Sequence, residues 1–210
     1  MIDFHLYFVT DRRQTSGRPL LDVVHAALDG GLRAVQLREK DLDGRTLYHL
    51  AADLRKLTSD YQAKLFINDR IDIALAIEAD GVHLGQTSLA VTDARRLLST
   101  EKLIGVSVHS PEEIAEATSA DFLVFGPVYF TPSKAIYGEP QGLAHLRQAV
   151  VSSPVPVLAI GGIHTERVAE ILTTGAYGVA VISALSAAPD PAQAAHDLLA
   201  QLTEQRECHD

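Results

Sequence analysis

Three cationic side chains lie near the ends of apolar runs, where they could bind a phosphorylated ligand. Arg38 and Lys40 end the run that begins at residue 34, and Lys134 lies in a long connection over 129–142. A guanidinium offers a planar fork for phosphate oxygens, and an ammonium offers a point charge. Since few acidic residues at these run ends would neutralise them, the three predict an anion-binding site.

Two adjacent glycines, Gly161 and Gly162, close the apolar run over 156–162 and lead directly into a helix-like segment. Glycine lets backbone N–H groups approach a phosphate without a Cβ in the way, and a helix N-terminus adds positive dipole character. Ser183 lies near the end of the next apolar run. These residues predict a phosphate-binding turn, and the alternative is a tight turn that binds nothing.

Asn68 and Asp69 follow the apolar run that begins at Lys64. A carboxylate near the predicted cations could hold Mg²⁺, which takes one or two carboxylates and fills its shell with water and phosphate oxygens. The alternative is that Asp69 caps the helix that begins near residue 70, a frequent role for Asp. The residue type alone does not choose between the two.

Ser107 and His109 are two residues apart at the end of the run over 103–108, so alternation along a strand places both on its inner side. A histidine there could act as a general acid or base. The alternative is a polar rim residue or a helix cap. Other polar side chains at the run ends are Asp11, Gln36, Glu39, Arg70, His83, Gln86, Thr131 and Ser133.

Eight apolar runs must position all of these residues, and they alternate with helix-like segments. The runs are rich in Val, Ile, Leu and Phe, which is typical of parallel strands covered on both faces. They span 6–11, 34–39, 64–69, 81–85, 103–108, 122–128, 156–162 and 178–184. The helix-like segments span 20–31, 43–61, 71–79, 91–99, 111–119, 143–151, 166–176 and 191–205.

Strict alternation predicts βαβ units, and eight repeats favour an α/β fold closed into a (β/α)8 barrel over an open sheet. The active sites of such barrels form at the C-terminal strand ends, where the polar residues above lie. We expect one barrel domain over residues 1–210, with a flexible tail over 204–210.

The composition limits which classes of molecule this protein could bind. The chain has 210 residues, with 18 Lys and Arg against 27 Asp and Glu and a formal net charge of −9. An acidic chain argues against nucleic-acid or anionic-membrane binding. The single cysteine, Cys208, can form neither an internal disulfide nor a Cys-rich zinc site. Without a long apolar run or a signal-peptide pattern, we expect a cytoplasmic protein.

With these motifs in place, the chain resembles the thiamine phosphate synthase / TenI family over nearly its whole length. The matching motifs are VTDRR (9–13), QLREKDL (36–42), INDRIDIALA (67–76), ADGVHLGQ (79–86), GVSVHS (105–110), FGPVYFTPSK (125–134), AIGGI (159–163) and GVAVISAL (178–185). The resemblance implies a small (β/α)8 barrel. For the synthase it implies the joining of hydroxymethylpyrimidine diphosphate to thiazole phosphate, with release of diphosphate.

The resemblance also implies roles for individual residues. The pyrimidine diphosphate would contact Gln36, Arg38, Lys40, Asn68 and Lys134. The thiazole phosphate would contact Thr131, Ser133, Gly162, Ile182 and Ser183, beside the turn at Gly161. Asp69 would hold Mg²⁺, and Ser107 would lie beside the reacting pyrimidine. Mg²⁺, Arg38 and Lys134 would stabilise the departing diphosphate, and the thiazole nitrogen, held nearby, would capture the pyrimidine-methyl cation.

One position departs from the synthase pattern. Synthases usually carry HLGQ-x-D, with the Asp as a second Mg²⁺ ligand, whereas HLGQTS places Ser88 there. A neutral hydroxyl is a far poorer Mg²⁺ ligand than a carboxylate. The TenI branch also lacks that Asp. It includes a thiazole tautomerase, which aromatises thiazole carboxylate phosphate without Mg²⁺ and whose catalytic histidine matches His109.

Three functions therefore stay open. The diphosphate-handling residues favour a Mg²⁺-dependent synthase, whereas the missing carboxylate favours a tautomerase that needs no cofactor. The third is a non-catalytic binder of thiamin-pathway phosphates. All three take small phosphorylated molecules, and the sequence is compatible with a homodimer without indicating one. Because Lys134 must reach the anion, we expect the connection over 129–142 to close over the substrate.

Overall fold

Eight parallel strands close into a barrel in the order of the sequence, with β8 paired to β1. The computed structural model describes residues 2–131 and 139–207. The strands are β1 (Leu6–Val9), β2 (Ala34–Leu37), β3 (Lys64–Asn68), β4 (Gly81–Leu84), β5 (Leu103–Val108), β6 (Phe122–Phe125), β7 (Val157–Ile160) and β8 (Gly178–Val181). All eight lie within the predicted runs, so the predicted (β/α)8 barrel is confirmed.

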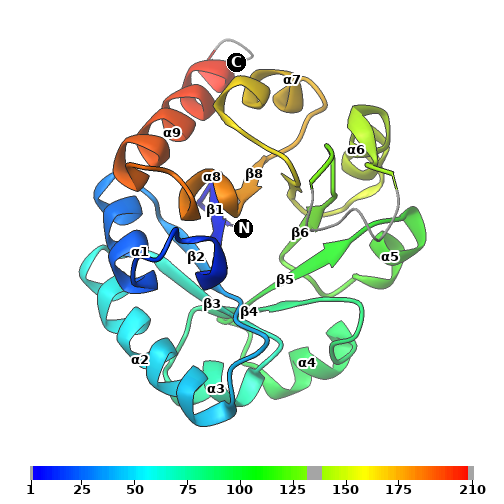
Figure 1. The fold of residues 1–210 in the computed structure, drawn as a ribbon. Helices are drawn as coiled ribbons and strands as arrows, with labels where there is room; N and C mark the ends of the chain where they lie inside the picture. The colour runs from blue at the N-terminus through cyan, green and yellow to red at the C-terminus, as the bar shows by residue number, and fades with distance from the viewer. Residues whose placement is uncertain (1, 132–138, 208–210) are drawn as a thin grey trace.

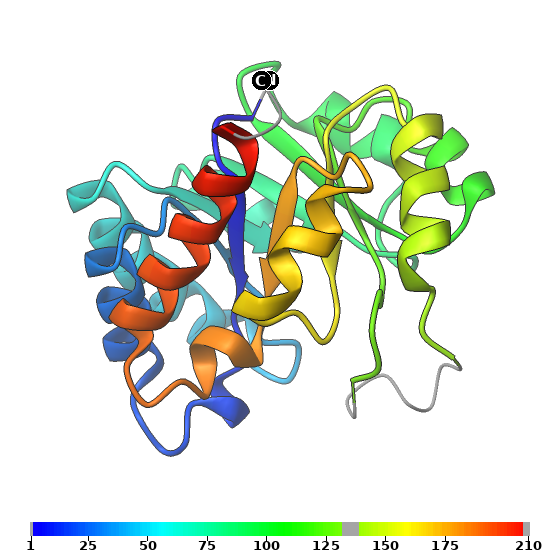
Figure 2. The ribbon, with the colours of Figure 1, turned by 90° about the horizontal axis from the view of Figure 1, so that it is seen from above.

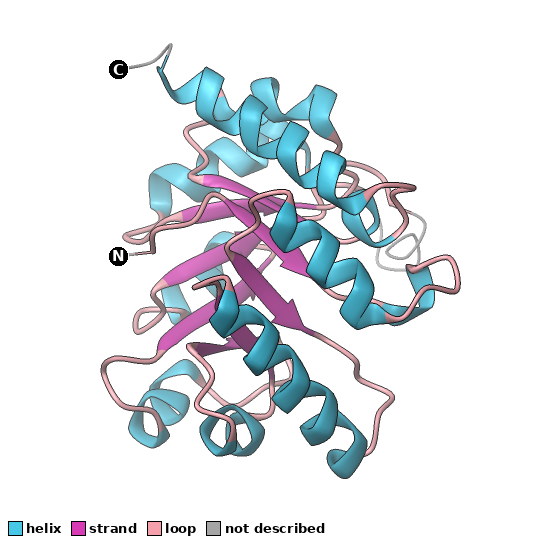
Figure 3. Ribbon diagram, turned by 90° about the vertical axis from the view of Figure 1, so that its left-hand side faces the viewer, coloured by secondary structure: helices cyan, strands magenta, loops and turns pink. Residues whose placement is uncertain are grey.

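Helices surround the barrel, as the view along its axis shows (Figure 1). The α-helices are α1 (Leu20–Asp29), α2 (Gly44–Asp60), α3 (Ile71–Ala76), α4 (Val91–Leu97), α5 (Pro111–Glu116), α6 (Gly142–Ser152), α7 (Val168–Leu172), α8 (Ser183–Ser186) and α9 (Pro191–Glu207). Two 3₁₀ turns are η1 (Arg12–Gln14) and η3 (Thr165–Arg167). Figure 3 shows the strands enclosed by this helical layer. None of the described helices has the length and apolar composition of a membrane span.

Local sequence explains several helix boundaries. Asp43 caps α2, since its carboxylate accepts the N–H groups of Arg45 and Thr46 at 3.0 Å. Helix α1 ends before Gly30 and Gly31, and Gly31 adopts φ +100°, which glycine tolerates best. The predicted boundaries differ from the observed ones by a few residues, because helix ends depend on capping contacts that periodicity does not contain.

The last strand ends earlier than predicted, and α8 replaces its expected end. The backbone leaves the strand at Ile182, whose carbonyl accepts the N–H groups of Leu185 and Ser186. Ser183 is therefore the first residue of a short helix. At the other end of the chain, α9 continues to Glu207, and residues 208–210 lie outside the described chain. The flexible tail over 204–210 stays a prediction.

Aromatic rings fill the interior of the barrel. Phe4, Tyr7, Phe66 and Phe122 pack with ring centroids 5.3–5.7 Å apart. Gly105 makes room for them, because a Cβ there would lie 2.3 Å from Phe122 Cζ. The interior is thus a packed core, and only its C-terminal end is available for a ligand. Figure 2 shows α8 and η1 at this end and the chain termini at the opposite end.

Candidate active site at the barrel mouth

Hydrogen bonds connect predicted site residues across the ends of β2, β3 and β4. Gln36 Nε2 donates to Asn68 Oδ1 at 3.0 Å, and Asn68 Nδ2 donates to Asp69 Oδ2 at 2.7 Å. Lys40 Nζ lies 3.7 Å from the same Asp69 oxygen. The hydroxyl of Ser88 donates to the other oxygen, Oδ1. The structure therefore brings all five residues into one polar cluster.

Asp69 does not cap the helix that follows it. The N-cap position of α3 is Arg70, and no side chain caps the helix there. The Asp69 backbone has φ +61°, which Asp tolerates better than most residues, and its N–H donates to the carbonyl of His83 at 3.0 Å. The capping alternative is therefore wrong, and the carboxylate faces Lys40 and Ser88.

Arg38 has no partner for its guanidinium within the described residues, although it is half-buried. Its backbone N–H donates to Thr10 Oγ1 at 3.0 Å. The nearby acids are satisfied by another cation: Arg12 donates to Glu39 at 3.0 Å and to both oxygens of Asp41 at 2.6 Å. The hydrogen bonds from Arg12 hold the pKa of Asp41 well below its usual range. The Arg38 guanidinium is therefore available to pair with an anionic ligand.

A pocket of about 200 Å³ lies beside Arg38 and Lys40. Its remaining lining residues are Asp11, Arg13, Glu39 and Asp41. Glu39 is 5% exposed and also accepts the hydroxyl of Thr10 at 2.8 Å. This buried carboxylate fastens the loop after β1 to the end of β2, a role that the sequence did not reveal. A glutamate in the sequence does not by itself indicate that its side chain will be buried.

His83 supports Ser107 from inside the barrel. Its Nε2 lies 2.9 Å from Ser107 Oγ, and its Nδ1 lies 3.4 Å from the hydroxyl of Tyr7. Burial lowers the pKa of His83 to about 3, so the ring is neutral. The neutral imidazole of His83 thus fixes the position of the Ser107 hydroxyl. The sequence placed His83 at the rim without a role, because a strand position does not identify which side chain of the neighbouring strand it will contact.

His109 pairs with α5 and not with Ser107. Its Nδ1 lies 3.1 Å from Glu113 Oε2, which also accepts the His109 backbone N–H at 2.6 Å. Gln86 Nε2 donates to the other oxygen of Glu113 at 2.6 Å. Burial alone would raise the pKa of Glu113, but the bonds from Gln86 and His109 outweigh it and lower the pKa. A carboxylate on Nδ1 orients a histidine for acid–base work through Nε2.

The double glycine packs tightly against the loop after β6. Gly161 and Gly162 have φ values of +104° and +65°. A Cβ on Gly161 would lie 2.6 Å from Pro127, and one on Gly162 would lie 2.7 Å from the carbonyl oxygen of Phe130. Loop packing therefore requires glycine at both positions, and the predicted phosphate-binding role of the turn stays a prediction. Their N–H groups remain candidates for binding phosphate.

The remaining predicted contacts lie on the loop after β6 and at the end of β8. Thr131 is half-buried in the loop after β6, Ile182 packs against the interior cluster and Ser183 is exposed at the start of α8. Ser133 and Lys134 lie outside the described residues. Their predicted contacts, and closure of the 129–142 connection, stay predictions.

The residues at Asp69 fit Mg²⁺ under one condition. Within the ranges that the structure describes, no group of three or more His, Cys, Asp and Glu side chains could hold a metal ion. The Asp69 carboxylate and Ser88 hydroxyl are oxygen donors, which Mg²⁺ prefers, but one carboxylate suffices only when phosphate oxygens complete the shell. The donor set therefore fits a Mg²⁺ ion that arrives with a diphosphate.

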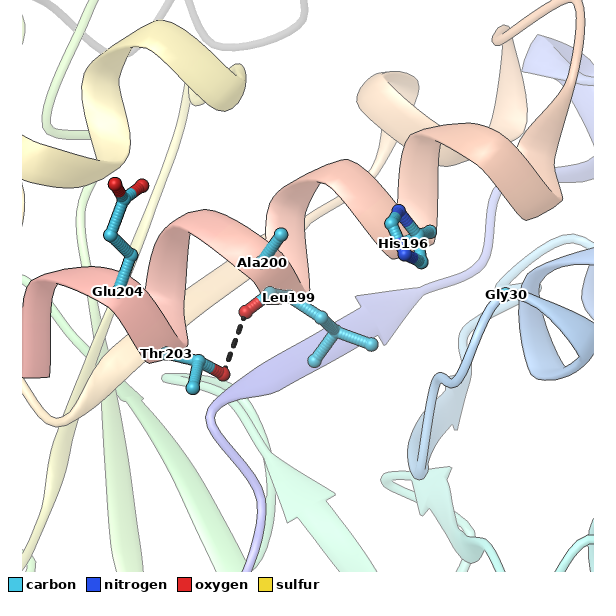
Figure 4. Close-up of a pocket in the computed structure, with 6 residues that line it drawn as sticks. All are labelled: Gly30, His196, Leu199, Ala200, Thr203 and Glu204. Atoms are coloured by element: carbon cyan, nitrogen blue, oxygen red, sulfur yellow. Dashed lines mark hydrogen bonds between the residues drawn. The ribbon is translucent and has the colours of Figure 1, made fainter. Parts of the chain in front are cut away.

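A larger pocket, of about 470 Å³, lies on the outside of the barrel and has different chemistry (Figure 4). It lies between Gly30, after α1, and the α9 residues His196, Leu199, Ala200, Thr203 and Glu204. None of its described lining residues is Lys or Arg, and the Thr203 hydroxyl donates to the carbonyl of Leu199 at 3.0 Å. It therefore lacks what a phosphate site needs.

Fold and site together define a (β/α)8 barrel with a cationic, amide-rich site for phosphorylated ligands at its C-terminal mouth. The family model described as thiamine monophosphate synthase matches residues 6–185. The chain belongs to this family, which confirms the predicted relationship.

Three known proteins match this chain over nearly their full lengths. A Geobacter sulfurreducens protein is 54% identical over 203 residues, which cover 96% of this chain and 95% of the relative, and its thiamine-phosphate synthase name is provisional. The thiamine-phosphate synthase of Moorella thermoacetica is 44% identical over 98% of this chain and 99% of its own. The solved thiamine phosphate pyrophosphorylase of Pyrococcus furiosus superposes with a TM-score of 0.86 at 40% identity, covering 96% of each chain.

Proposed function

We propose that this protein joins hydroxymethylpyrimidine diphosphate to thiazole phosphate and releases thiamine phosphate and diphosphate. The observation that carries the proposal is the half-buried guanidinium of Arg38 at the mouth, which has no partner among the described residues and lies next to the cluster of Gln36, Lys40, Asn68 and Asp69. A diphosphate needs such a concentration of donors. An isomerase that acts on a monophosphate does not.

The pyrimidine diphosphate binds at the ends of β2 and β3. Arg38 donates two parallel hydrogen bonds to phosphate oxygens, and Lys40 turns from its 3.7 Å contact with Asp69 to the same group. Asn68 holds the amide of Gln36, so the remaining amide atoms of Gln36 are fixed for the pyrimidine. Lys134 approaches the diphosphate from the 129–142 connection.

The reaction exchanges one bond for another at the pyrimidine methylene. Its carbon–oxygen bond breaks, the electron pair leaves with diphosphate, and the thiazole nitrogen supplies the pair for the new carbon–nitrogen bond. Arg38 and Lys40 stabilise the charge that develops on the departing oxygen. Ser107, held by His83 at 2.9 Å, lies beside the pyrimidine and fixes its position.

Asp69 and Ser88 would hold Mg²⁺ together with the diphosphate oxygens. When bound, the ion supplies Lewis-acid neutralisation of the leaving group. The thiazole phosphate binds at the Gly161–Gly162 turn, Thr131, Ser133, Ile182 and Ser183. Its phosphate holds the thiazole nitrogen near the methylene carbon, which makes the second step effectively intramolecular.

One observation favours a second function, the thiazole tautomerase. The pairing of His109 Nδ1 with Glu113 leaves Nε2 as the basic atom, and a proton shift needs such a base. The same pairing also serves as a capping contact for α5, because Glu113 accepts the His109 backbone N–H. The names of the relatives favour the synthase.

A single-turnover incubation tests the proposal. The purified protein receives hydroxymethylpyrimidine diphosphate, thiazole phosphate and Mg²⁺, and we expect thiamine phosphate and diphosphate in equal amounts. Arg38→Gln should slow the reaction roughly 100-fold. Arg96→Gln, at an exposed pair with Asp93 on α4, should leave it unchanged.

Two other results would overturn the proposal. Metal-independent aromatisation of thiazole carboxylate phosphate, lost in His109→Asn and without thiamine phosphate formation, would establish the tautomerase. Binding of both substrates without any turnover would establish the non-catalytic binder. The homodimer, the cytoplasmic location and the absence of a nucleic-acid partner stay predictions.

A further inference from the structure

Four residues connect the loop after β6 to the loop after β7, and we call them the Tyr129 clamp: Tyr129, Gly162, Arg167 and Glu170. Arg167 Nη1 donates to the carbonyl oxygen of Gly162, and the guanidinium carbon lies 4.2 Å from the centre of the Tyr129 ring. The Tyr129 hydroxyl donates to Glu170 Oε1 at 2.5 Å. The clamp therefore joins η3 and α7 to the double-glycine turn.

The clamp determines which way two peptide groups of the turn point. A trans peptide directs its C=O and N–H in opposite directions. The Gly161 carbonyl accepts the Tyr129 N–H at 3.1 Å, and the Gly162 carbonyl accepts Arg167. The N–H groups of Gly162 and Ile163 therefore point away from the clamp. Neither has an acceptor in the part of the chain that the structure describes, and successive N–H groups turned the same way bind anions.

A double glycine needs such a restraint. Both residues have positive φ, and glycine passes between backbone conformations at little cost, so the Gly162 carbonyl could rotate and take the Ile163 N–H with it. A planar guanidinium can stack on a ring and donate to a carbonyl at once, which a lysine ammonium cannot do in the same geometry. Arg167 is half-buried, and its place on Tyr129 fixes this plane.

We propose that Arg167, seated on Tyr129, is a positioning residue that holds the Gly162 carbonyl so that the turn presents two N–H donors to the phosphate of the thiazole substrate. The inference rests on the proposed function for the identity of that phosphate. It assigns Arg167 no contact with the reacting atoms. Its effect is confined to one of the two substrates, which a purely structural residue would not achieve.

Steady-state kinetics with both substrates tests the inference. Arg167→Gln should raise the KM for thiazole phosphate roughly 10–100-fold, the effect of losing charge-assisted hydrogen bonds, and leave the KM for the pyrimidine diphosphate within about twofold. Arg167→Lys should resemble Arg167→Gln. Tyr129→Leu should show the same selective rise, whereas Tyr129→Phe, which keeps the ring face, should resemble the unmodified protein.

Arg33 offers a matched control at the opposite end of the barrel. Its guanidinium donates to the carbonyl oxygens of Leu32 and Leu28 at 2.7 and 3.3 Å, so Arg33→Gln also removes an arginine from backbone carbonyls. It should lower Tm and leave both KM values unchanged. An equal rise of both KM values in Arg167→Gln, or a normal KM for thiazole phosphate in folded Arg167→Lys, would overturn the inference.

Calorimetric titration with thiazole phosphate separates this inference from the proposed function, because it requires no turnover. One outcome is that the unmodified protein forms no thiamine phosphate but binds thiazole phosphate, and that Arg167→Gln weakens that binding at least tenfold. This outcome would support the positioning role of Arg167 and contradict the proposed synthase function. The opposite outcome is that the protein is an active synthase and that folded Arg167→Gln binds thiazole phosphate with unchanged affinity. This outcome would support the proposed synthase function and contradict the positioning role of Arg167.

Discussion

At the scale of single residues, Ser88 lies where the resemblance to synthases implied a second Mg²⁺-binding carboxylate. Its hydroxyl accepts the Gly85 N–H at 2.6 Å and donates to Asp69 Oδ1. Ser88→Asp would place a second carboxylate beside Asp69. We expect the Mg²⁺ concentration for half-maximal activity to fall at least tenfold, because carboxylates dominate the affinity for hard cations.

The free protein provides an independent measurement of the same substitution. Two adjacent carboxylates repel each other without a cation, so Ser88→Asp should lower Tm in a chelator and recover it when Mg²⁺ is added. Ser88→Asn, of similar shape but neutral, should show neither effect. An unchanged Mg²⁺ requirement in folded Ser88→Asp would mean that residue 88 is not at the metal.

His83 should affect the pH dependence of stability. Its folded pKa of about 3 lies below the ordinary value near 6.5, so between these pH values the unfolded chain takes up a proton here and the folded chain does not. The free energy of unfolding therefore decreases as the pH falls below 6.5. Between pH 7 and pH 5, His83→Gln should reduce this loss by roughly 2 kcal/mol, measured by urea unfolding. An equal decrease in the free energy of unfolding in the unmodified protein and in His83→Gln would mean that His83 is also charged in the folded core.

Sequence reasoning at this scale identified the residues better than their partners. Gln36, Lys40, Asn68 and Asp69 were predicted separately and form one cluster. The contact of His83 with Ser107 joins neighbouring strands, and that of Glu39 with Thr10 joins two loops, so both depend on which strands lie side by side in the sheet. Residue types at strand ends indicate which chemistry is available, but not which side chains already satisfy one another.

At the scale of elements, one arrangement recurs at the N-terminal end of the barrel. Asp80 precedes β4, accepts the Leu65 N–H at 2.9 Å and pairs with Arg55 of α2 at 2.5 Å. Asp121 precedes β6 and repeats both contacts with Ile104 and with Arg95 of α4. In each case a carboxylate joins the start of a strand to the preceding strand and to the helix that comes before that preceding strand. The N-terminal face of such a barrel serves stability, in contrast to the C-terminal face that holds the active site.

Removal of one such carboxylate should destabilise the fold in a pH-dependent way. Burial alone would raise the pKa of Asp80, but the Leu65 N–H and the Arg55 pair outweigh it and lower the pKa. This stability is therefore present above the unfolded pKa near 3.9 and is lost as the pH falls through the lower folded value. Asp80→Asn should cost about 1.5–3 kcal/mol at pH 7, measured by urea unfolding, and less at pH 3.

Two further variants serve as a parallel case and as a control for that measurement. Asp121→Asn should resemble Asp80→Asn at pH 7, since the contacts are equivalent. Asp93→Asn removes the exposed pair with Arg96 on α4 and should change stability by less than about 1 kcal/mol. A cost for Asp80→Asn that is the same at pH 3 and pH 7 would show that its charge is not what stabilises the strand start.

The elements themselves were the most predictable part of the molecule, for a physical reason. Each strand is buried on both faces, so its sequence is a continuous apolar run, and eight such runs are visible without coordinates. Helix α8 could not be predicted in this way. Its four residues, Ser183–Ser186, contain no helical period, and its start at Ile182 depends on backbone geometry.

At the scale of the whole molecule, the charge distribution contrasts with the net charge. The chain carries −9 overall, yet Arg38 at the mouth has no partner in the ranges described. Several surface acids elsewhere pair with cations, as Asp93 does with Arg96. An unpaired, half-buried cation lowers the stability of the empty barrel, because its desolvation is not offset. An anion that binds there should therefore stabilise the whole fold.

Thermal unfolding measures this coupling directly. At a concentration one hundred times its Kd, diphosphate with Mg²⁺ adds about 2.7 kcal/mol to the free energy of unfolding. For a chain of this size that corresponds to a rise in Tm of roughly 5–10 °C. Arg38→Gln should raise Tm of the ligand-free protein or leave it unchanged and should abolish most of the diphosphate shift, while Arg96→Gln should keep it. A full shift in Arg38→Gln would move the anion site away from the end of β2, because a site that still gains the same free energy from diphosphate does not depend on that guanidinium.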